Sequence, residues 1–300
     1  MRILIAGGTG FLGRALVSRL AESGHEVTVL MRNPTAVVDN RAKTVLWNPQ
    51  DPEILAHAVN GAEAVLNFAG ESIGGRRWSS RQKEIIVRSR IQSAQALYSA
   101  IQKAERRPGV YLSASGVGIY GDVPDGEVSE AHPPGNDFLA TTCVRWEEGA
   151  NAFSNLGLRV VIFRLGVVLG KGGGALARMA IPFRLFAGGI LGTGRQWFPW
   201  VHIVDVASAV VYALQDPDFS GPANLVAPEA VTMDAFCRDL GRVLRRPVFM
   251  KVPSFAMRAV LGEMAEMLLT GQRAVPVKLR AAGFRFAFPT ISSALTEVLT

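Results

Sequence analysis

Residues 2–20 read RILIAGGTGFLGRALVSRL, and this stretch decides the fold of the chain. A short apolar run leads into Gly7, Gly10 and Gly13, and the apolar positions after them recur with the period of a helix. A strand, a glycine-rich turn and an amphipathic helix in this order are typical of a dinucleotide-binding βαβ unit. The β-branched run at 26–31 supplies the second strand of that unit. The sequence therefore predicts a parallel, Rossmann-type sheet that begins with the first strand.

The three glycines have different tasks in such a turn. Gly7 permits the tight turn, Gly10 lets the backbone approach a pyrophosphate, and Gly13 lets the helix pack closely on the strand. The first turn of the helix adds free N–H groups and a partial positive charge. A glycine-rich turn without a ligand is the alternative, but the strand before it and the helix after it favour a cofactor. The residues expected at the cofactor phosphates are Gly7, Thr9, Gly10, Phe11, Leu12 and Gly13.

The end of the second strand indicates which dinucleotide is bound. Sites that prefer NAD carry Asp or Glu here, whose carboxylate accepts hydrogen bonds from the ribose hydroxyls. This chain has Arg32 instead, and its guanidinium could pair with the 2′-phosphate of NADP. An ordinary surface arginine after a strand is the alternative interpretation. We therefore expect NADP(H) as the cofactor, in preference to NAD(H).

Strand and helix patterns alternate along the first 165 residues, as parallel βαβ units require. The patterns predict strands at 2–6, 26–31, 43–47, 64–68, 110–113 and 159–164, and helices at 11–22, 51–59, 80–104 and 137–156. A glycine-rich stretch at 170–200 follows. Beyond it we expect helices at 203–215, 232–244 and 254–269, strands near 223–227 and 247–252, and a final helix.

These patterns predict an α/β protein with a doubly wound parallel sheet and a smaller C-terminal α/β lobe. We expect a cofactor domain at 1–169, rejoined by residues 201–228, and a substrate-binding lobe at 170–300. The cleft between the two is the expected ligand site.

The composition argues against several functional classes. The net charge is +7, but the basic residues are scattered and do not alternate with aromatic ones, so a solvated surface is favoured over a nucleic-acid site. A positive field would also suit an anionic ligand such as a phosphate-rich cofactor. No apolar run reaches the roughly 18 residues that span a bilayer, and the first residues lack a signal-peptide pattern. We expect a cytoplasmic protein without a membrane or nucleic-acid partner.

The two cysteines, Cys143 and Cys237, are far apart and form no CxxC pattern. Buried free thiols in a reducing compartment are the simplest interpretation. No spacing among His, Cys, Asp and Glu predicts a metal site.

Three motifs resemble the extended, epimerase-like branch of the short-chain dehydrogenase/reductases: GGTGFLG at 7–13, NFAG at 67–70 and SASGVGIYG at 113–121. Longer segments, such as 182–206 and 262–286, resemble an atypical subfamily described as epimerase family or NAD-dependent epimerase/dehydratase proteins, mostly of unassigned substrate. The resemblance implies an oxidoreductase or epimerase that acts on a small molecule.

The resemblance also implies further cofactor contacts. Phe68, Ala69 and Gly70 would lie under the adenosine and ribose. Arg90 stands where the wider family commonly has an asparagine facing the cofactor, although a surface helix arginine is the alternative. The residues expected to flank the nicotinamide half are Leu165 and Val168.

One part of the family pattern is missing. Its chemistry uses a tyrosine as general acid/base and a lysine four residues later, which lowers the pKa of the tyrosine and holds the nicotinamide ribose. The residues four positions after Tyr98, Tyr111, Tyr120 and Tyr212 are Gln102, Ser115, Pro124 and Asp216. The region where the pair should fall, 139–147, reads LATTCVRWE, and the usual serine position falls on Gly116.

Three residues are candidates for the missing acid/base group, in the order Ser115, Glu71 and His202. Ser115 could instead cap backbone at a strand end, and Glu71 could stabilise a helix start. His202, between Trp200 and Asp205, is the histidine in a motif-like context, and we expect Asp205 to cap the following helix. Cys143 is close to the missing tyrosine, but a thiol in an apolar helix is usually core. Residues that could line a substrate pocket, without a recognisable specificity pattern, are Arg178, Arg184, Gln196, Trp197, Trp200 and His202.

Two classes of function remain open. One is an NADP-dependent oxidoreductase or epimerase with an altered acid/base group. The other is a catalytically silent NADP-binding sensor or scaffold, since the resemblance extends to plant proteins linked to plastid division. We also expect a homodimer that pairs the helices at 80–104 and 137–156. Apolar residues available for that interface are Ile86, Leu97, Ile101 and Phe153, although core packing explains them equally well.

Overall fold

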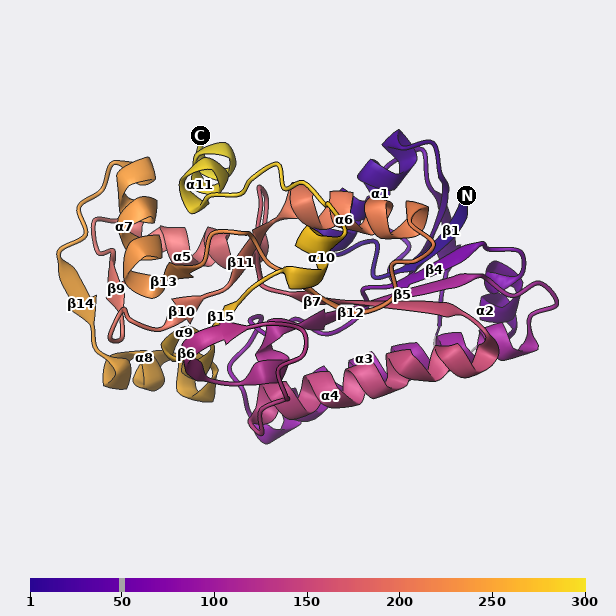
Figure 1. The fold of residues 1–300 in the computed structure, drawn as a ribbon, viewed down its shortest axis with the longest axis horizontal. Coiled ribbons are helices and arrows are strands. Elements are labelled where there is room, and N and C mark those ends of the chain that lie inside the picture. Colours follow the sequence, from indigo (N-terminus) through magenta and orange to yellow (C-terminus); the bar gives the residue numbers. More distant parts are fainter. Residues whose placement is uncertain (49–51) are drawn as a thin grey trace.

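A seven-stranded parallel sheet forms the centre of the molecule (Figure 1). The structure is a computed structural model that describes residues 1–48 and 52–300. The strand order is β3-β2-β1-β4-β5-β7-β12, and Ile3 of β1 pairs with Val27 on one side and Ala64 on the other. The predicted doubly wound parallel sheet is confirmed. The strands are β1 (Arg2–Ala6), β2 (Glu26–Met31), β3 (Lys43–Leu46), β4 (Ala64–Asn67), β5 (Val110–Gly116), β7 (Arg159–Leu165) and β12 (Gly221–Leu225).

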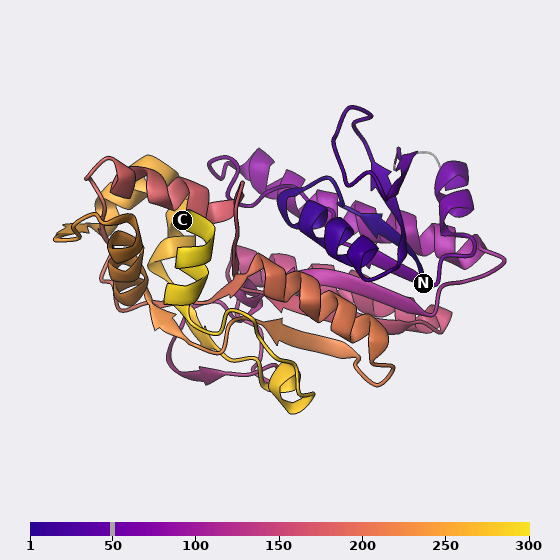
Figure 2. The same ribbon diagram turned by 90° about the horizontal axis from the view of Figure 1, so that it is seen from above.

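Helices cover both faces of this sheet, and Figure 2 shows the layers from above. On one face lie α1 (Phe11–Glu22) and α6 (Ile203–Gln215), whose apolar residues pack on the sheet in one core. On the other face α2 (Pro52–Val59), α3 (Ser80–Lys103) and α4 (Phe138–Asn151) form a second core. Because both faces are covered, the central strands β1, β4, β5 and β7 are mostly buried and mainly apolar rather than alternating.

The chain leaves the sheet after β7 and returns to it with α6 and β12. In β12, Ala223 pairs with Phe163 of β7. Residues far apart in the sequence therefore share one core, and the carboxyl ends of β5, β7 and β12 meet at one edge of the sheet.

The remaining elements form a lobe beyond that edge, with a core of its own (Figure 1). Its strands make short two-stranded pairs: β8 (Val167–Leu169) with β11 (Trp200–His202), β9 (Gly189–Leu191) with β14 (Met250–Val252), β10 (Trp197–Phe198) with β13 (Val231–Thr232), and β6 (Val123–Val128) with β15 (Gln272–Ala274). Its helices are α5 (Gly174–Arg184), α7 (Met233–Leu244), α8 (Ser254–Leu261), α9 (Glu266–Leu269) and α11 (Ile291–Leu299). Helix α10 (Val277–Ala281) packs against β12, and its Leu279 belongs to the core of the central sheet. The 3-10 turns of the chain are η1 (Val117–Tyr120), η2 (Ala152–Leu156) and η3 (Gly262–Ala265).

Several predicted boundaries are wrong. The helix expected at 254–269 is broken into α8, η3 and α9, because Gly262 has a φ of +63° that a continuous helix does not allow. The helix expected at 137–156 becomes η2 after Asn151, and the strand near 247–252 covers only Met250–Val252. The strand near 223–227 is β12, which starts and ends two residues earlier. The first residue of the helix expected at 51–59 lies outside the described residues.

The apolar residues named for a dimer interface belong to the core, which was their alternative explanation. Ile86, Leu97, Ile101 and Phe153 are each 0% exposed, since they pack inside their own subunit. None of the large hydrophobic residues that the described chain exposes lies on α3 or α4. Across residues 1–48 and 52–300, no helix is both long enough and apolar enough to cross a lipid bilayer.

Candidate functional site

The turn between β1 and α1 is closed by backbone contacts that only glycine allows. Gly7 has a φ of +86°, and a Cβ there would lie 2.5 Å from the Phe68 carbonyl carbon. A Cβ at Gly13 would overlap the Gly7 carbonyl oxygen. Gly10 differs, because the one heavy atom near its Cβ would be the Gly7 oxygen at 3.4 Å. The backbone at Gly10 is therefore open on the side that a ligand would approach.

The first turn of α1 carries unpaired N–H groups at this opening. Gly10 is the N-cap, no side chain caps the helix, and its first turn holds no acidic residue. The N–H groups of Phe11, Leu12 and Gly13 have no partner within the described chain. Arg14 fixes the turn, since its Nη1 donates to the Thr9 carbonyl at 2.9 Å. The helix thus presents donors and its positive dipole end to an anion.

Arg32 lies at the same edge of the sheet, directly after β2, which pairs with β1. Its side chain is exposed. It forms no hydrogen bond or ion pair with any residue in 1–48 or 52–300. The guanidinium is therefore free to contact a ligand bound over the turn.

The segment after β4 forms the next part of the site, and Arg90 of α3 lies directly behind it. A Cβ at Gly70 would be 3.1 Å from the Arg90 Cζ. The Arg90 Nη1 donates to the carbonyls of Glu71 at 3.0 Å and Ile86 at 2.9 Å. The guanidinium also lies 4.7 Å from the ring centre of Trp146. Phe68 and Ala69 continue this segment toward the Gly7 turn, where the Phe68 carbonyl meets Gly7.

Arg90 is a buried cation that forms no ion pair in the part of the chain that the structure describes, although the Glu71 carboxylate is near enough to raise its pKa slightly. Its side chain is 8% exposed, and its contacts are carbonyl oxygens and an aromatic ring. Burial lowers the pKa of Arg90. A cation in this environment favours an anionic ligand close to Gly70.

A second polar cluster stands at the carboxyl end of β5. Ser115 donates to the Glu147 Oε1 of α4 at 2.7 Å. Arg164 of β7 holds the same carboxylate with two hydrogen bonds, Nε to Oε1 at 2.9 Å and Nη2 to Oε2 at 2.8 Å. Burial lowers the pKa of Arg164, but its bonds to Glu147 outweigh burial and raise it overall. Both side chains are about 10% exposed, so this is a buried, charge-assisted network.

Leu165 and Val168 connect this edge to the lobe. Leu165 ends β7, Val168 lies in β8, and both are half-buried. Between them Gly166 touches the Pro199 carbonyl so closely that no side chain fits. The glycines after β8 serve a similar purpose, because the Phe11 ring lies against Gly173 and Gly174. The turn between β1 and α1 and the lobe are thus in direct contact.

Comparison with known proteins identifies this arrangement. Residues 3–226 match the model of the NAD dependent epimerase/dehydratase family, and residues 252–298 match a domain of unknown function, DUF1731. The chain belongs to the NAD-dependent epimerase/dehydratase family. It is 40% identical to epimerase family protein SDR39U1 of Bos taurus over 100% of both chains. It is 37% identical to epimerase family protein YfhF of Bacillus subtilis, over 100% of this chain and 98% of YfhF.

A solved structure supports the same assignment. The human epimerase family protein SDR39U1, crystallised with NADPH, superposes with a TM-score of 0.88 at 36% identity, over 99% of each chain. A nucleoside-diphosphate sugar epimerase from Corynebacterium glutamicum superposes with a TM-score of 0.80 at 30% identity, over 100% of this chain and 58% of that one. The resemblance to an epimerase family of unassigned substrate is confirmed.

Two tyrosines of this epimerase/dehydratase family member, Tyr111 and Tyr120, make contacts inside the fold. Tyr111 is fully buried, stacks on Phe153 at 3.6 Å, and burial raises its pKa. The Tyr120 hydroxyl donates to the Asn224 Oδ1 at 2.6 Å and accepts from the Arg164 Nη1 at 2.9 Å. Neither hydroxyl is presented to an open cleft.

Cys143 and Glu147 of α4 are four residues apart, the same spacing as the missing tyrosine and lysine. The Cys143 Sγ would lie 3.7 Å from a Cβ at Gly116, and Ser115 is adjacent. Burial raises the pKa of the Cys143 thiol to about 11, so it is protonated at neutral pH. The sequence pattern pointed to Cys143 but not to Glu147 or Arg164. The available signal for Glu147 was its position four residues after Cys143.

The three acid/base candidates are not brought together. Ser115 contacts Glu147, and no hydrogen bond joins it to Glu71 or His202 in the described chain. Glu71 is partly exposed directly after Gly70, and its N–H donates to the Ser89 Oγ at 2.9 Å. It therefore lies next to the segment 68–70 and to Arg90, which donates to its carbonyl.

His202 has both ring nitrogens engaged by the protein. It is the N-cap of α6, where Nδ1 accepts from the Val204 N–H at 3.3 Å, and Nε2 donates to the Glu297 Oε2 of α11 at 2.9 Å. The ring also stacks near Phe288 at 3.8 Å. The expected cap, Asp205, instead accepts from the N–H groups of Ala287 and Phe288. These contacts favour a structural role for His202, at a surface cleft that Phe11, Arg14 and Lys171 also line.

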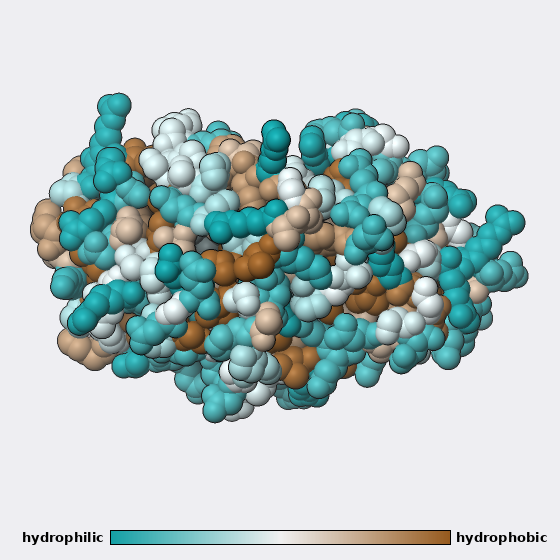
Figure 3. Space-filling model, in the orientation of Figure 1, coloured by the Kyte–Doolittle hydropathy of each residue, from teal (hydrophilic) through white to brown (hydrophobic). Residues whose placement is uncertain are grey.

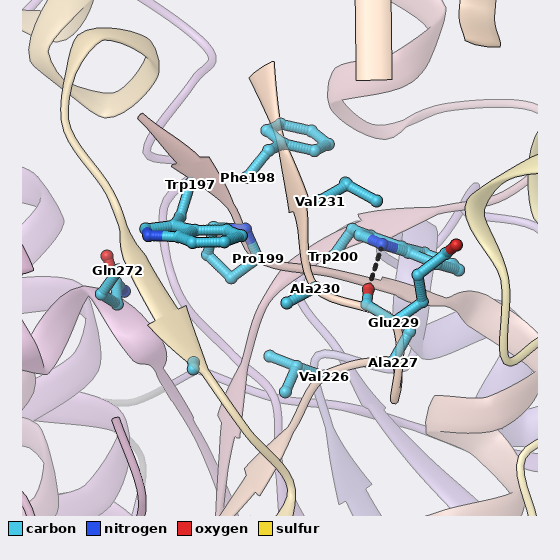
Figure 4. Close-up of a pocket in the computed structure, with 11 residues that line it drawn as sticks. Trp197, Phe198, Pro199, Trp200, Val226, Ala227, Glu229, Ala230, Val231 and Gln272 are labelled. Atoms are coloured by element: carbon cyan, nitrogen blue, oxygen red, sulfur yellow. Dashed lines mark hydrogen bonds between the residues drawn. The ribbon is translucent and has the colours of Figure 1, made fainter. Parts of the chain in front are cut away.

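The other pocket candidates separate into two groups. Trp197 and Trp200 line a small hollow beside the sheet edge (Figure 4), where the Trp200 Nε1 donates to the Glu229 carbonyl at 3.1 Å. The remainder of that hollow is mainly apolar: Phe198, Pro199, Val226, Ala227, Ala230, Val231 and Ala274, with Glu229 and Gln272. The Gln196 Nε2 donates to two backbone carbonyls within the lobe, those of Leu191 and Leu268. Arg178 donates to the Gly74 carbonyl, and Arg184 is exposed.

Proposed function

We propose that the chain is an NADP(H)-dependent oxidoreductase or epimerase-like protein that acts on a small molecule held between the sheet edge and the lobe. The observation that carries this proposal is the open backbone at Gly10 beside the unpaired N–H groups of Phe11 and Leu12. A pyrophosphate fits such a cradle because donors and a positive helix end meet where no side chain intrudes. Human SDR39U1, which was crystallised with NADPH, supports the proposal.

Different residues around the turn would bind different parts of the cofactor. The α1 turn would hold the pyrophosphate, Arg32 the 2′-phosphate, and Phe68, Ala69 and Gly70 the adenosine side. Arg90 supplies a buried positive charge on the far side of Gly70. Leu165 and Val168 would border the nicotinamide end. NADP(H), when bound, supplies or accepts a hydride.

We assign the acid/base position to Ser115 ahead of Glu71 and His202. The Ser115 hydroxyl lies at the carboxyl end of β5, and its bond to Glu147 fixes its orientation. Glu147 accepts the hydrogen bond of Ser115, and Arg164 holds both oxygens of the same carboxylate in place. Glu71 stands beside Gly70 with a partly exposed carboxylate, and His202 ranks last because both of its nitrogens are engaged.

The test is a substrate screen that follows NADPH absorbance, repeated on Ser115→Ala, Glu71→Gln and His202→Asn. We expect turnover to fall about 10²–10⁴-fold in the variant that removes the acid/base group. NADPH binding should persist in all three variants, because none removes a phosphate contact. Robust turnover that survives all three changes would place the chemistry elsewhere.

A catalytically silent NADP-binding sensor or scaffold is the second candidate. The observation in its favour is that the polar groups near the missing tyrosine already have hydrogen-bond partners within the protein. Ser115 donates to Glu147, and Glu147 accepts from Arg164. The pKa of about 11 for Cys143 likewise leaves no reactive thiolate there. This candidate predicts tight NADPH binding with no change of cofactor redox state across the same screen.

We further propose a cytoplasmic setting, since both cysteines are buried free thiols. A curated relative from Arabidopsis thaliana, 39% identical over 100% of this chain and 87% of its own length, is described as chloroplastic, so the compartment differs among relatives. A homodimer also stays a proposal, which light scattering at micromolar concentration tests.

A further inference from the structure

The exposed apolar residues of this protein gather at the outer end of the lobe, away from the cofactor turn. The described chain exposes thirteen large hydrophobic residues, and seven of them lie in two short segments, 181–186 and 249–260. We call this set the lobe-end patch: Ile181 (52% exposed), Leu185 (71%), Phe186 (61%), Phe249 (75%), Met250 (45%), Phe255 (75%) and Val260 (69%). Exposed apolar residues that gather in one region of a surface often mark a docking site.

The two segments of the patch are neighbours in space. Strand β9, which follows α5, pairs with β14, so that Gly189 is the partner of Met250. Arg246 lies over the Phe186 ring at 4.2 Å, which joins the end of α5 to the segment before β14. In Figures 1 and 2 β14 and α8 stand at the end of the molecule opposite α2. Figure 3 shows tan and brown side chains reaching the surface there among teal ones.

All charges within these segments are positive. Residues 178–192 and 240–262 contain no Asp or Glu. The cations next to the apolar side chains are Arg184, Arg245, Arg246, Lys251 and Arg258. Arg258 is paired with Glu266 of α9, but Arg184 and Lys251 form no ion pair within the described chain. The patch therefore combines projecting apolar groups with a net positive field.

The backbone is strained where it presents this patch. Phe186 has a φ of +59° and Arg245 a φ of +55°, and these are the two non-glycine residues with positive φ in the described chain. Both follow the end of a helix, where glycine is the usual residue. A side chain with a Cβ adopts this left-handed backbone region only at an energetic cost. The presence of Phe186 and Arg245 at these positions despite the cost indicates that their side chains have a function there.

We propose that the lobe-end patch docks the protein on an anionic lipid bilayer, with the phenylalanines at the acyl boundary and the cations at the acidic headgroups. Exposed aromatic residues flanked by Arg and Lys have the composition of an interfacial membrane contact. A second copy of the chain fits less well as the partner. In a two-fold symmetric contact through this patch, the cations of one copy would lie against the same cations of the other. A nucleic acid would use the cations but would not require Leu185 or Val260. Peripheral docking needs no spanning helix, so it agrees with the absence of one among the described residues.

Vesicle co-sedimentation of the full chain tests the proposal. We expect binding to vesicles of mixed phosphatidylcholine and phosphatidylglycerol, weaker binding as salt is added, and little binding to phosphatidylcholine alone. The variant Phe249→Ser/Phe255→Ser should lose about tenfold in affinity per phenylalanine, which corresponds to burial of that side chain. The variant Arg184→Gln/Lys251→Gln should lose about fivefold per charge.

Matched substitutions elsewhere serve as controls. Val277→Ser removes an exposed apolar residue outside the patch, and Arg107→Gln removes an exposed cation. Both should bind vesicles as the unmodified protein does. Thermal unfolding and NADPH binding of the patch variants should be unchanged, which separates this proposal from the proposed function.

Four outcomes would overturn the proposal. The first is equal binding to neutral and acidic vesicles, or none to either. The second is full binding by the patch variants. The third is a loss confined to the cation variant, which would indicate a polyanion without an apolar contact. The fourth is a dimer by light scattering that the phenylalanine variant converts to monomer, which would show that a second copy covers the patch.

Discussion

Arg164 and Glu147 form a bidentate pair beneath the carboxyl edge of the sheet, with contacts of 2.9 Å and 2.8 Å. The pair ties β7 to α4, and it also receives Ser115 from β5 and Tyr120 from η1. Tyr120 extends it to Asn224 of β12. Three strands that end at the candidate site are thus fixed to one another by a single buried network, which keeps that edge rigid.

The first prediction concerns this pair. Glu147→Gln should destabilise the protein by about 3–5 kcal/mol, because it leaves the Arg164 charge buried without a counterion. Urea unfolding measures the change. Glu148→Gln, one residue along on the exposed side of α4, should stay within about 0.5 kcal/mol of the unmodified protein. The double variant Glu147→Leu/Arg164→Met should recover most of the loss, and failure to do so would mean that the pair stabilises by more than mutual neutralisation.

The second prediction concerns the open backbone at Gly10. Gly10→Val should fold, since a Cβ there meets one oxygen at 3.4 Å, but it should abolish NADPH binding by filling the space of the pyrophosphate. Calorimetric titration measures the affinity. Gly74→Ala is the matched control, because a Cβ at Gly74 meets no atom within 4 Å. Unchanged affinity in Gly10→Val would remove the basis of the proposed function.

The third prediction concerns cofactor choice. NADPH should bind roughly 10- to 100-fold more tightly than NADH, since a charge-assisted contact from Arg32 is worth about 1.5–3 kcal/mol. Arg32→Asp should shrink or reverse this preference. Arg19→Asp, an exposed change on α1, should leave the ratio of the two affinities unchanged. Equal affinities in the unmodified protein would show that Arg32 points away from the cofactor.

The sheet could be predicted from the sequence because its signals are local. The RILIAGGTGFLG segment specifies a strand, a turn and a helix within a dozen residues, and Gly13 indeed lies where a side chain would overlap the Gly7 carbonyl oxygen. The break at Gly262 was missed, since the apolar pattern continues through it and the sign of φ is not visible in a pattern. Helices end where tertiary contacts or caps outweigh periodicity.

The candidate site was only partly predictable, because its polar groups meet through long-range contacts. Ser115 could be selected as a strand-end hydroxyl, but its partner Glu147 lies 32 positions away and Arg164 a further 17. His202 drew attention because it stands in a motif-like segment, although its motif serves a helix cap and the α11 contact. A sequence pattern can identify an important residue, but it does not show which other residues its side chain contacts.

The last prediction concerns pH. Burial lowers the pKa of His202 below its ordinary value of 6.5, while the bond to Glu297 partly offsets this. A histidine with a lowered pKa in the fold is protonated more readily in the unfolded chain. Its contribution to stability is therefore complete above about pH 6.5 and is lost progressively as the pH falls below it. Protonation would also turn Nδ1 into a donor that faces the Val204 N–H, which breaks the cap of α6.

His202→Asn should accordingly flatten the decline in thermal stability between about pH 7.5 and pH 5.5, since asparagine can cap the helix but does not titrate. The comparison requires His25→Asn as a control, because burial lowers the pKa of His25 as well and gives the same sign. Burial raises the pKa of Asp205, which acts with the opposite sign at lower pH and is common to all three proteins. Calorimetric melting curves at matched ionic strength measure the slope. An unchanged slope in His202→Asn, with a flattened one in His25→Asn, would show that the α6–α11 contact does not sense pH in this range.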